Sequence, residues 1–339
     1  MPDRSTLTQH RLAPTLAMLG VTLAWGGTFL TVQSVLRVYP PYLFLALRFA
    51  LAALFLLILR PKLFKRLHRR DLIFGGVAGL ILAAGYVLQT MSLLPASMGG
   101  TTAARSAFIT GMYVVITPVA AAIIYRKRPT IGTVLGAVFI VTGLCFMSGI
   151  TFGASSISWV RGDTLVLIGT FTYAGHILWL AHPKHSHDTI TLTFVQMLMV
   201  SVSCTVLSVA TGEKWSMPPS AKVWFMIIFC AIFASALAFM IEIWVLKRLP
   251  PSRVALIEIT ESFFGGVAGW LWTRHAPTYE VIGAACILGG MVLSELIAMQ
   301  RANRNKTPLE FFGEVGEGPP LVVTESNNEE DLAPVSEPT

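Results

Sequence analysis

Ten long apolar runs divide the first 300 residues of this 339-residue chain, and they constrain its fold more than any other feature. They cover residues 12–35, 42–59, 72–94, 100–125, 131–150, 162–180, 190–210, 221–246, 254–273 and 279–299. A helix needs about 20 mostly apolar residues to cross a bilayer. Backbone groups in lipid find partners only within helices or closed barrels, and these runs are too long for barrel strands. We therefore predict an all-α membrane protein with ten transmembrane helices.

The composition agrees with a lipid environment. Only 13% of the residues are charged and 54% are apolar, whereas soluble domains carry about 25% charged residues. The four cysteines, Cys145, Cys204, Cys230 and Cys286, are isolated within apolar runs, so we interpret them as packing residues rather than metal ligands or disulfides. The sequence contains no GxxxxGK[ST] loop, and we expect neither ATP hydrolysis nor a cofactor.

Basic residues alternate between the loops in a way that predicts topology. If the N-terminus is cytoplasmic, the inner loops and termini hold 18 Lys and Arg residues and the outer loops hold 5. Because cytoplasmic loops collect basic residues, both termini are predicted to be cytoplasmic. We expect a multi-pass protein of the plasma (inner) membrane.

The C-terminal segment has the opposite charge. Residues 307–339 contain eight acidic residues and no Lys or Arg, so the net charge of +7 leaves +15 on the rest of the chain. Those basic residues lie in short loops, and we interpret them as topology signals rather than a nucleic-acid surface. Residues 301–339 are predicted to form an acidic, disordered cytoplasmic tail.

A short motif occurs twice at corresponding places. Residues 136–143 read GAVFIVTG and residues 283–290 read GAACILGG, so both fit GAxxIxxG and start 147 residues apart. They predict two five-helix repeats, in residues 1–150 and 151–300. Because each repeat has an odd number of helices, the second enters the membrane upside down. Inverted repeats are a known basis of alternating access, with a site near the bilayer midplane, and so favour a transporter.

Several motifs together resemble those of the drug/metabolite transporter superfamily in its EamA-type, ten-helix form. They are Trp25-Gly26-Gly27-Thr28-Phe29, Pro40-Pro41, Leu47-Arg48-Phe49, Leu88-Gln89-Thr90, the stretch 107–115 leading to Pro118, Gly162-Asp163, residues 193–196 and the two GAxxIxxG motifs. The similarity extends over residues 12–299. It implies export of small metabolites, amino acids or related compounds first, and it marks Arg48 as a structural element of the second helix. One departure is Ser262, which stands where the family has a proline in the ninth helix.

Charged residues within the predicted spans are the first candidates for a site, because a charge at the bilayer centre costs roughly 2.5–3.5 kcal/mol. Arg105 adjoins a polar stripe that includes Thr110 and Tyr113. It could bind a substrate carboxylate, or it could pair with a buried glutamate and hold helices together.

Three glutamates could couple transport to protons. Glu258 and Glu261 are three residues apart on one helix face, and Glu242 lies in the preceding span. Burial and neighbouring like charges favour the protonated form of a carboxyl group, so one of them could carry a proton. The alternative is a static ion pair with Arg48 or Arg105.

Further polar and aromatic residues could line a substrate pocket: Trp25, Tyr86, Gln89, Tyr173 and His176. Helix packing is the alternative for each of them. Gln89 is the best candidate, because an unpaired amide in lipid is costly.

Other functions are also compatible with the sequence. His182, His185 and His187 with Asp188 have spacing that could bind a metal, although a flexible loop with exposed histidines is far commoner. A membrane-embedded enzyme or lipid-handling protein could use these histidines or the glutamates. An importer or exchanger of nucleotide-sugar-like solutes would need more basic residues in its cavity. We expect a small-molecule metabolite and the lipid bilayer as partners, no nucleic acid, and a monomer or homodimer.

Overall fold

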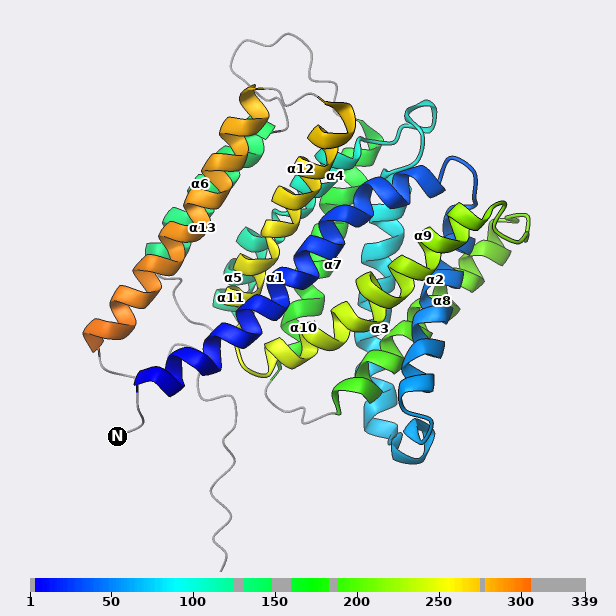
Figure 1. Cartoon of the computed structure of the whole chain (residues 1–339), viewed down its shortest axis with the longest axis horizontal. Coiled ribbons are helices and arrows are strands. Elements are labelled where there is room, and N and C mark those ends of the chain that lie inside the picture. The colour runs from blue at the N-terminus through cyan, green and yellow to red at the C-terminus, as the bar shows by residue number, and fades with distance from the viewer. Residues whose placement is uncertain (1–3, 125–130, 148–159, 183–187, 275–277, 306–339) are drawn as a thin grey trace, which may run out of the picture.

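A computed structural model describes residues 4–124, 131–147, 160–182, 188–274 and 278–305 (Figure 1). Every regular element within these ranges is a helix. The first set is α1 (Arg4–Val35), α2 (Pro41–Leu59), η1 (Leu63–Arg66), α3 (Arg69–Ser92), η2 (Ala96–Met98), α4 (Ala103–Thr110), α5 (Tyr113–Ile124) and α6 (Ile131–Met147). The second set is α7 (Arg161–Leu180), α8 (Thr189–Ala210), α9 (Ala221–Ala231), η3 (Ile232–Leu237), α10 (Ala238–Leu246), α11 (Pro251–Glu258), α12 (Thr260–Thr273) and α13 (Thr278–Asn305). Helix α13 continues to Asn305, so the first five residues of the predicted disordered tail (301–305) are helical, and residues 306–339 lie outside the described residues.

Seven helical segments of the described chain are long and apolar enough to cross a bilayer. The other three predicted spans correspond to α6, α7 and α13, which do not meet the same criteria of length and mean hydropathy. Helices α6 and α13 contain the shorter apolar stretches Val134–Gly143 and Val281–Gly290. Seven crossings therefore follow from length and composition, and ten remain a prediction.

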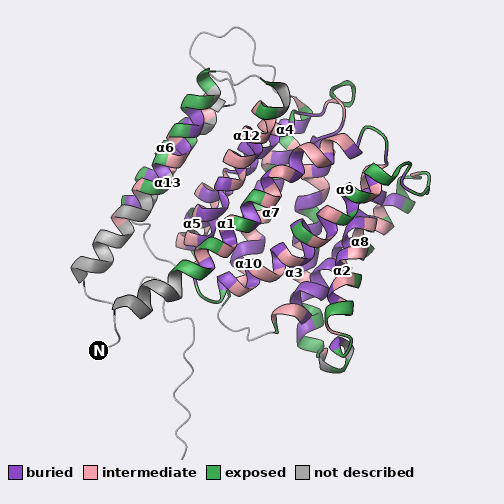
Figure 2. Cartoon of the chain, viewed as in Figure 1, coloured by how far each residue is buried: buried purple, intermediate pink, exposed green. Residues whose placement is uncertain are grey.

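The molecule has apolar side chains outside and polar side chains inside. Ile58, Ile123 and Phe225 are each more than two-thirds exposed, whereas Arg48 and Glu242 are 2% exposed. Figure 2 shows buried residues along the inward faces of the helices and exposed ones on their outer faces. This distribution suits lipid contact outside and a polar interior that supplies its own partners.

Helix packing follows one pattern before and after residues 148–159. The first helix of each set packs on the broken helix of the other set: α1 on α12, and α7 on α4 and α5. Each first helix also packs on the third span of a set: α7 on α3, and α1 on η3 and α10. Helix α2 pairs with α8, and α6 pairs with α13 at one edge of the molecule (Figure 1). Exchanging the two sets of helices leaves these pairings unchanged, as expected for a duplicated unit.

Close contacts give the direction of the paired helices. A Cβ placed on Gly143 would lie 2.5 Å from the carbonyl oxygen of Gly283, and one on Gly290 would lie 2.9 Å from that of Gly136. The end of each GAxxIxxG motif thus meets the beginning of the other. Helices α6 and α13 therefore run antiparallel, and their glycines permit the close approach.

Helices α2 and α8 are also antiparallel and are joined at both ends. The Glu213 carboxylate accepts hydrogen bonds from the backbone N–H groups of Tyr42 (3.0 Å) and Leu43 (2.8 Å) at the start of α2. At the other end, Arg60 forms an ion pair with Asp188, which caps α8. Partial burial of Asp188 opposes ionisation, but hydrogen bonds from Arg60 and Thr191 outweigh it and lower the pKa of this carboxyl group.

Two helices break near the middle of the molecule. The predicted span 100–125 divides into α4 and α5 around Gly111, and the predicted span 254–273 divides into α11 and α12 at Ile259. The broken helices touch where Ser262, at the expected proline position, donates a hydrogen bond to the carbonyl oxygen of Ala107 (2.6 Å). A Cβ on Gly111 would lie 2.6 Å from the Ser262 hydroxyl, so glycine allows this contact.

Candidate functional site

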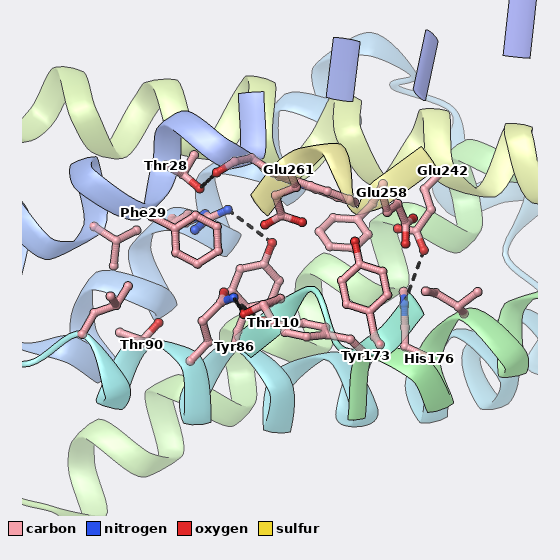
Figure 3. A pocket seen from close by; sticks show the side chains of 18 residues that line it. Thr28, Phe29, Tyr86, Thr90, Thr110, Tyr173, His176, Glu242, Glu258 and Glu261 are labelled. Atoms are coloured by element: carbon pink, nitrogen blue, oxygen red, sulfur yellow. Dashed lines mark hydrogen bonds and ion pairs between the residues drawn. The ribbon is translucent and has the colours of Figure 1, made fainter. Parts of the chain in front are cut away.

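A cavity lies where the broken helices meet α1, α3, α7 and α10 (Figure 3). Nine of the ten predicted site residues line it: Trp25, Tyr86, Gln89, Thr110, Tyr173, His176, Glu242, Glu258 and Glu261. Its other lining residues are Thr28, Phe29, Val32, Arg48, Thr90, Leu93, Tyr113, Ile177 and Phe239. Side chains from helices on both sides of residues 148–159 therefore share one interior space.

A hydrogen-bond chain crosses the cavity wall between α3, α4 and α7. The Gln89 amide donates to the Thr110 hydroxyl (3.1 Å) and accepts from the Tyr173 hydroxyl (3.0 Å). Thr110 in turn donates to the carbonyl oxygen of Ser106 (2.8 Å). Both ends of the amide are thus paired, which fixes Gln89 in a position that would otherwise be costly in lipid.

Arg48 is buried beside the cavity, and sequence reasoning missed this position by treating the residue as purely structural. Its guanidinium donates to the Ser235 hydroxyl (2.8 Å), to the carbonyl oxygen of Ala234 (3.1 Å) and to the Tyr86 hydroxyl (3.4 Å). Its central carbon also lies 4.9 Å from the centroid of the Tyr86 ring. A buried charge in a predicted span was the signal that could have identified it.

The backbone partner of Arg48 belongs to a π-helical turn. Helix η3 is a π-helix between α9 and α10, and the Ala234 carbonyl oxygen accepts both from Arg48 and from the Trp25 indole (2.9 Å). Such turns release carbonyl groups from the regular helical ladder and are frequent at functional sites. The turn links α1 and α2 to α10 at the cavity wall.

The three predicted carboxyl groups converge on the cavity (Figure 3). Glu242 lies 3.6 Å from Nδ1 of His176, and the other ring nitrogen of His176 lies 2.6 Å from the Gln196 amide oxygen. Among the described residues, one oxygen of Glu242 and one of Glu258 have no hydrogen-bond partner. The helix break at Ile259 puts Glu258 at the end of α11 and Glu261 in the first turn of α12.

The prediction of a static ion pair between these glutamates and Arg48 or Arg105 is wrong for the described structure. Arg48 is held by neutral groups, and Arg105 pairs with Asp163 (2.7 Å). Sequence reasoning did not consider Asp163 as the partner, because only tertiary packing brings the start of α7 beside α4. Glu242 has a histidine neighbour instead.

Arg105 lies outside the cavity lining. The Asp163 carboxylate that binds its guanidinium also accepts a hydrogen bond from Thr101 (2.6 Å) and one from the backbone N–H of Val160 (3.0 Å). Asp163 is fully buried, and the ion pair ties the start of α7 to α4, while the Thr101 hydrogen bond ties it to the segment before α4. That Arg105 binds substrate remains a prediction.

The histidine-rich loop falls largely outside the described residues, which exclude His185 and His187. Within the described residues no cluster of three or more His, Cys, Asp or Glu side chains is arranged to hold a metal ion. Asp188, the acidic member of the predicted set, instead pairs with Arg60 and caps α8.

Comparison with known proteins identifies the family. The EamA-like transporter family matches this sequence twice, over residues 13–149 and again over residues 160–296. The chain belongs to the EamA-like transporter family. The two matches start 147 residues apart, the same offset as the two GAxxIxxG motifs. This member is accordingly a multi-pass membrane transporter.

Individual relatives agree with this family. An uncharacterized transporter of Archaeoglobus fulgidus is 28% identical over 254 residues, covering 75% of this chain and 76% of the relative. The uncharacterized transporter YyaM of Bacillus subtilis is 26% identical over 298 residues, covering 85% of this chain and 95% of the relative. A crystal structure with 16% identity shares the fold, with a TM-score of 0.65 over 85% of this chain and 99% of that chain.

Proposed function

We propose that this EamA-like protein is a secondary transporter that exports small metabolites, such as amino acids or related compounds, by alternating access. The observation that carries the proposal is the polar cavity enclosed by helices of both family repeats. Largely buried sites with apolar walls and a few convergent polar groups are typical of small-molecule binding.

We propose that ten transmembrane helices form two inverted five-helix repeats, in residues 1–150 and 151–300, that rock around this cavity. The antiparallel pairing of α6 with α13 and of α2 with α8 supports inversion. Each pair consists of corresponding helices of the two repeats, and corresponding helices run in opposite directions when one repeat is inverted. The broken helices would act as hinges, since they meet at the cavity through Ser262 and Ala107.

Protons are proposed to drive export through Glu242, Glu258 and Glu261. A desolvated carboxylate without a cationic partner is costly in a membrane interior. Protonation of these glutamates would therefore favour conformations that bury them, and release of the protons would favour conformations that expose them to water. The support is that one oxygen each of Glu242 and Glu258 lacks a partner within the described structure. His176, beside Glu242, could pass a proton to it.

Reconstituted vesicles test transport and coupling together. Purified protein is placed in vesicles loaded with labelled amino acids and related metabolites, with and without an imposed pH gradient. We expect movement of at least one solute that accelerates with the gradient. Vesicles containing the triple variant Glu242→Gln, Glu258→Gln, Glu261→Gln should lose the acceleration. If no solute of a broad panel moves, the proposal fails; if the triple variant responds like the parent, proton coupling through these residues fails.

The cavity gives little support to nucleotide-sugar transport. Phosphate groups are usually bound by several Arg or Lys side chains. Arg48 is the single Arg or Lys in the described cavity lining, and its guanidinium already donates to Ser235, Ala234 and Tyr86.

A further inference from the structure

The cavity combines an excess of acidic groups with aromatic walls, and this combination bears on the charge of the transported solute. Three carboxyl groups (Glu242, Glu258 and Glu261) face one guanidinium (Arg48) among the described lining residues. His176 is the one other basic side chain in that lining, and it is adjacent to Glu242. Acidic side chains therefore outnumber basic ones in the described lining.

Arg48 is poorly placed to neutralise a solute carboxylate. Its Nε donates to Ser235 and its Nη2 to Ala234 and Tyr86, and its central carbon lies 5.2 Å from the centroid of the Phe49 ring as well as 4.9 Å from that of Tyr86. The ring contacts and hydrogen bonds already stabilise its charge. A carboxylate could therefore not form the two parallel hydrogen bonds of a full arginine pair without displacing some of these partners.

The glutamates, in contrast, retain free acceptor capacity. Glu258 and Glu242 are each 2% exposed, and both line the cavity. One oxygen of each has no partner within the described residues. Figure 3 shows the Glu242 and Glu258 side chains next to each other and Glu261 further along the cavity. Buried, unpartnered acceptors that share a cavity favour a donor-bearing, positively charged ligand.

The walls around these acids suit an apolar body and also favour a cation. The rings of Trp25 and Phe239 are neighbours at 5.4 Å between centroids, and those of Tyr86 and Tyr173 at 5.9 Å. Aromatic faces attract ammonium groups electrostatically, most strongly where water is excluded. The cavity thus offers both a surface for an alkyl or aryl group and negative potential for its charged end.

We propose that the cavity binds an organic cation: a protonated or quaternary amine with an apolar or aromatic body and no carboxylate. Its ammonium group is held by Glu242 and Glu258, and its body lies against the aromatic walls. A zwitterionic amino acid would need a second, free cation for its carboxylate, which the described lining does not offer. The proposal rests on the transport function above, and protons and the amine would occupy the same carboxyl groups in alternation.

Binding to the full-length protein in detergent micelles tests the charge preference. Calorimetry is performed with a series that shares one phenyl ring: phenethyltrimethylammonium, phenethylamine, phenylalanine, 3-phenylpropionate and uncharged 2-phenylethanol. We expect both amines to bind at least about tenfold more tightly than phenylalanine, as one charge-assisted contact would give, and 3-phenylpropionate to bind most weakly. Equal or tighter binding of phenylalanine or 3-phenylpropionate, or no binding of either amine, would overturn the proposal.

Variants identify the groups responsible. Glu242→Gln and Glu258→Gln should each weaken amine binding by about 10- to 100-fold and leave 2-phenylethanol binding unchanged. A variant whose cavity has collapsed would instead bind neither the amine nor 2-phenylethanol. Glu213→Gln is the matched control, because it removes the same charge at the start of α2, outside the cavity lining. If one glutamine variant fails to fold, the other and Glu258→Asp still provide the test. Amine affinity unchanged in the folded variants would contradict the assignment.

Vesicle transport separates this proposal from the proposed function. Phenethyltrimethylammonium carries a permanent charge and does not cross lipid unaided at a useful rate. Its protein-dependent movement would support both proposals. Movement of phenylalanine or another amino acid without any movement of the quaternary amine would overturn cation recognition while leaving the transport function intact. If none of the solutes moves, both fail.

Discussion

At the residue scale, most of the polar side chains buried in the cavity are paired, and the exceptions are acidic. Gln89 is paired through both ends of its amide, and Arg48 is paired with a hydroxyl and a carbonyl oxygen. Glu242 and Glu258 each keep one oxygen unpartnered within the described structure. Unpaired buried acceptors reduce stability, so their presence in a cavity is better explained by a bound proton or ligand than by packing.

Replacing Arg48 by lysine should impair the cavity although the charge is kept. Lysine cannot reproduce donors to Ser235 and Ala234 at fixed angles. We expect a loss of about 1.5–3 kcal/mol in unfolding free energy, as for hydrogen bonds to a charged group, and at least a tenfold loss of transport. Thermal unfolding in detergent and vesicle transport measure the two effects.

The matched control for this change is Arg248→Lys. Arg248 is an exposed residue whose guanidinium stacks on Trp244 and donates to its carbonyl oxygen. Its replacement should change the unfolding free energy by about 0.5 kcal/mol at most. Equal effects of the two substitutions would contradict the role given to the buried network of Arg48.

Gln196 is predicted to set the proton position on His176. Its amide nitrogen lies 3.4 Å from the Leu192 carbonyl oxygen as a donor, which leaves its oxygen to accept from the imidazole (2.6 Å). The other ring nitrogen, Nδ1, is then the one that exchanges a proton with Glu242.

Gln196→Met removes this acceptor and keeps the volume. We expect proton-driven transport to fall by about tenfold, as when other hydrogen-bond partners that orient a histidine are removed. The dependence of the rate on pH should also change, whereas solute affinity should change little. Rates across a pH series, compared with calorimetric affinity, check this. A uniform loss of rate and affinity at every pH would indicate a structural role alone.

At the scale of helices, glycines decide how closely the walls of the cavity approach. A Cβ on Gly26 in α1 would lie 2.6 Å from Cβ of Phe264 and 2.8 Å from the carbonyl oxygen of Glu261 in α12. Neighbouring Gly27 has no atom within 4 Å of such a Cβ. Adjacent glycines thus have different roles, one in packing and one facing open space.

Gly26→Ala should therefore destabilise the protein by about 1–3 kcal/mol, because the clash involves backbone that cannot move without separating α1 from α12. Gly27→Ala is the control, and it should be neutral or stabilising by up to about 1 kcal/mol, as alanine favours a helix interior. Thermal unfolding of the two variants in the same detergent measures the difference. A larger loss for Gly27→Ala would contradict the close packing of these helices.

At the scale of the whole molecule, the fold places its charges in the interior and at loop positions. The distribution of 18 basic residues in the predicted inner loops and termini against 5 in the outer loops predicts that both ends are cytoplasmic. An inverted pair of five-helix repeats requires the same placement.

Single cysteines introduced into a cysteine-free variant test that topology. Lys62→Cys and Lys65→Cys, between α2 and α3, should be protected from an impermeant thiol reagent in intact cells. Lys214→Cys, in the α8–α9 connection, and Lys222→Cys, at the start of α9, should react. Labelling of both pairs from the same side would refute five crossings per repeat.

The sequence by itself determined the lipid environment, the duplication and the family. Hydropathy and small-residue motifs are properties of short stretches of sequence, so they can be recognised without knowing which segments pack together. It also selected nine of the lining residues, since a polar side chain within a span has few alternatives to a cavity. Tertiary structure decided which charges meet. Asp163 became the partner of Arg105 and Ser235 that of Arg48 only because α7 approaches α4, and the π-helical turn η3 approaches α2. Pairings between distant segments depend on helix rotation and close approach, which no local pattern specifies.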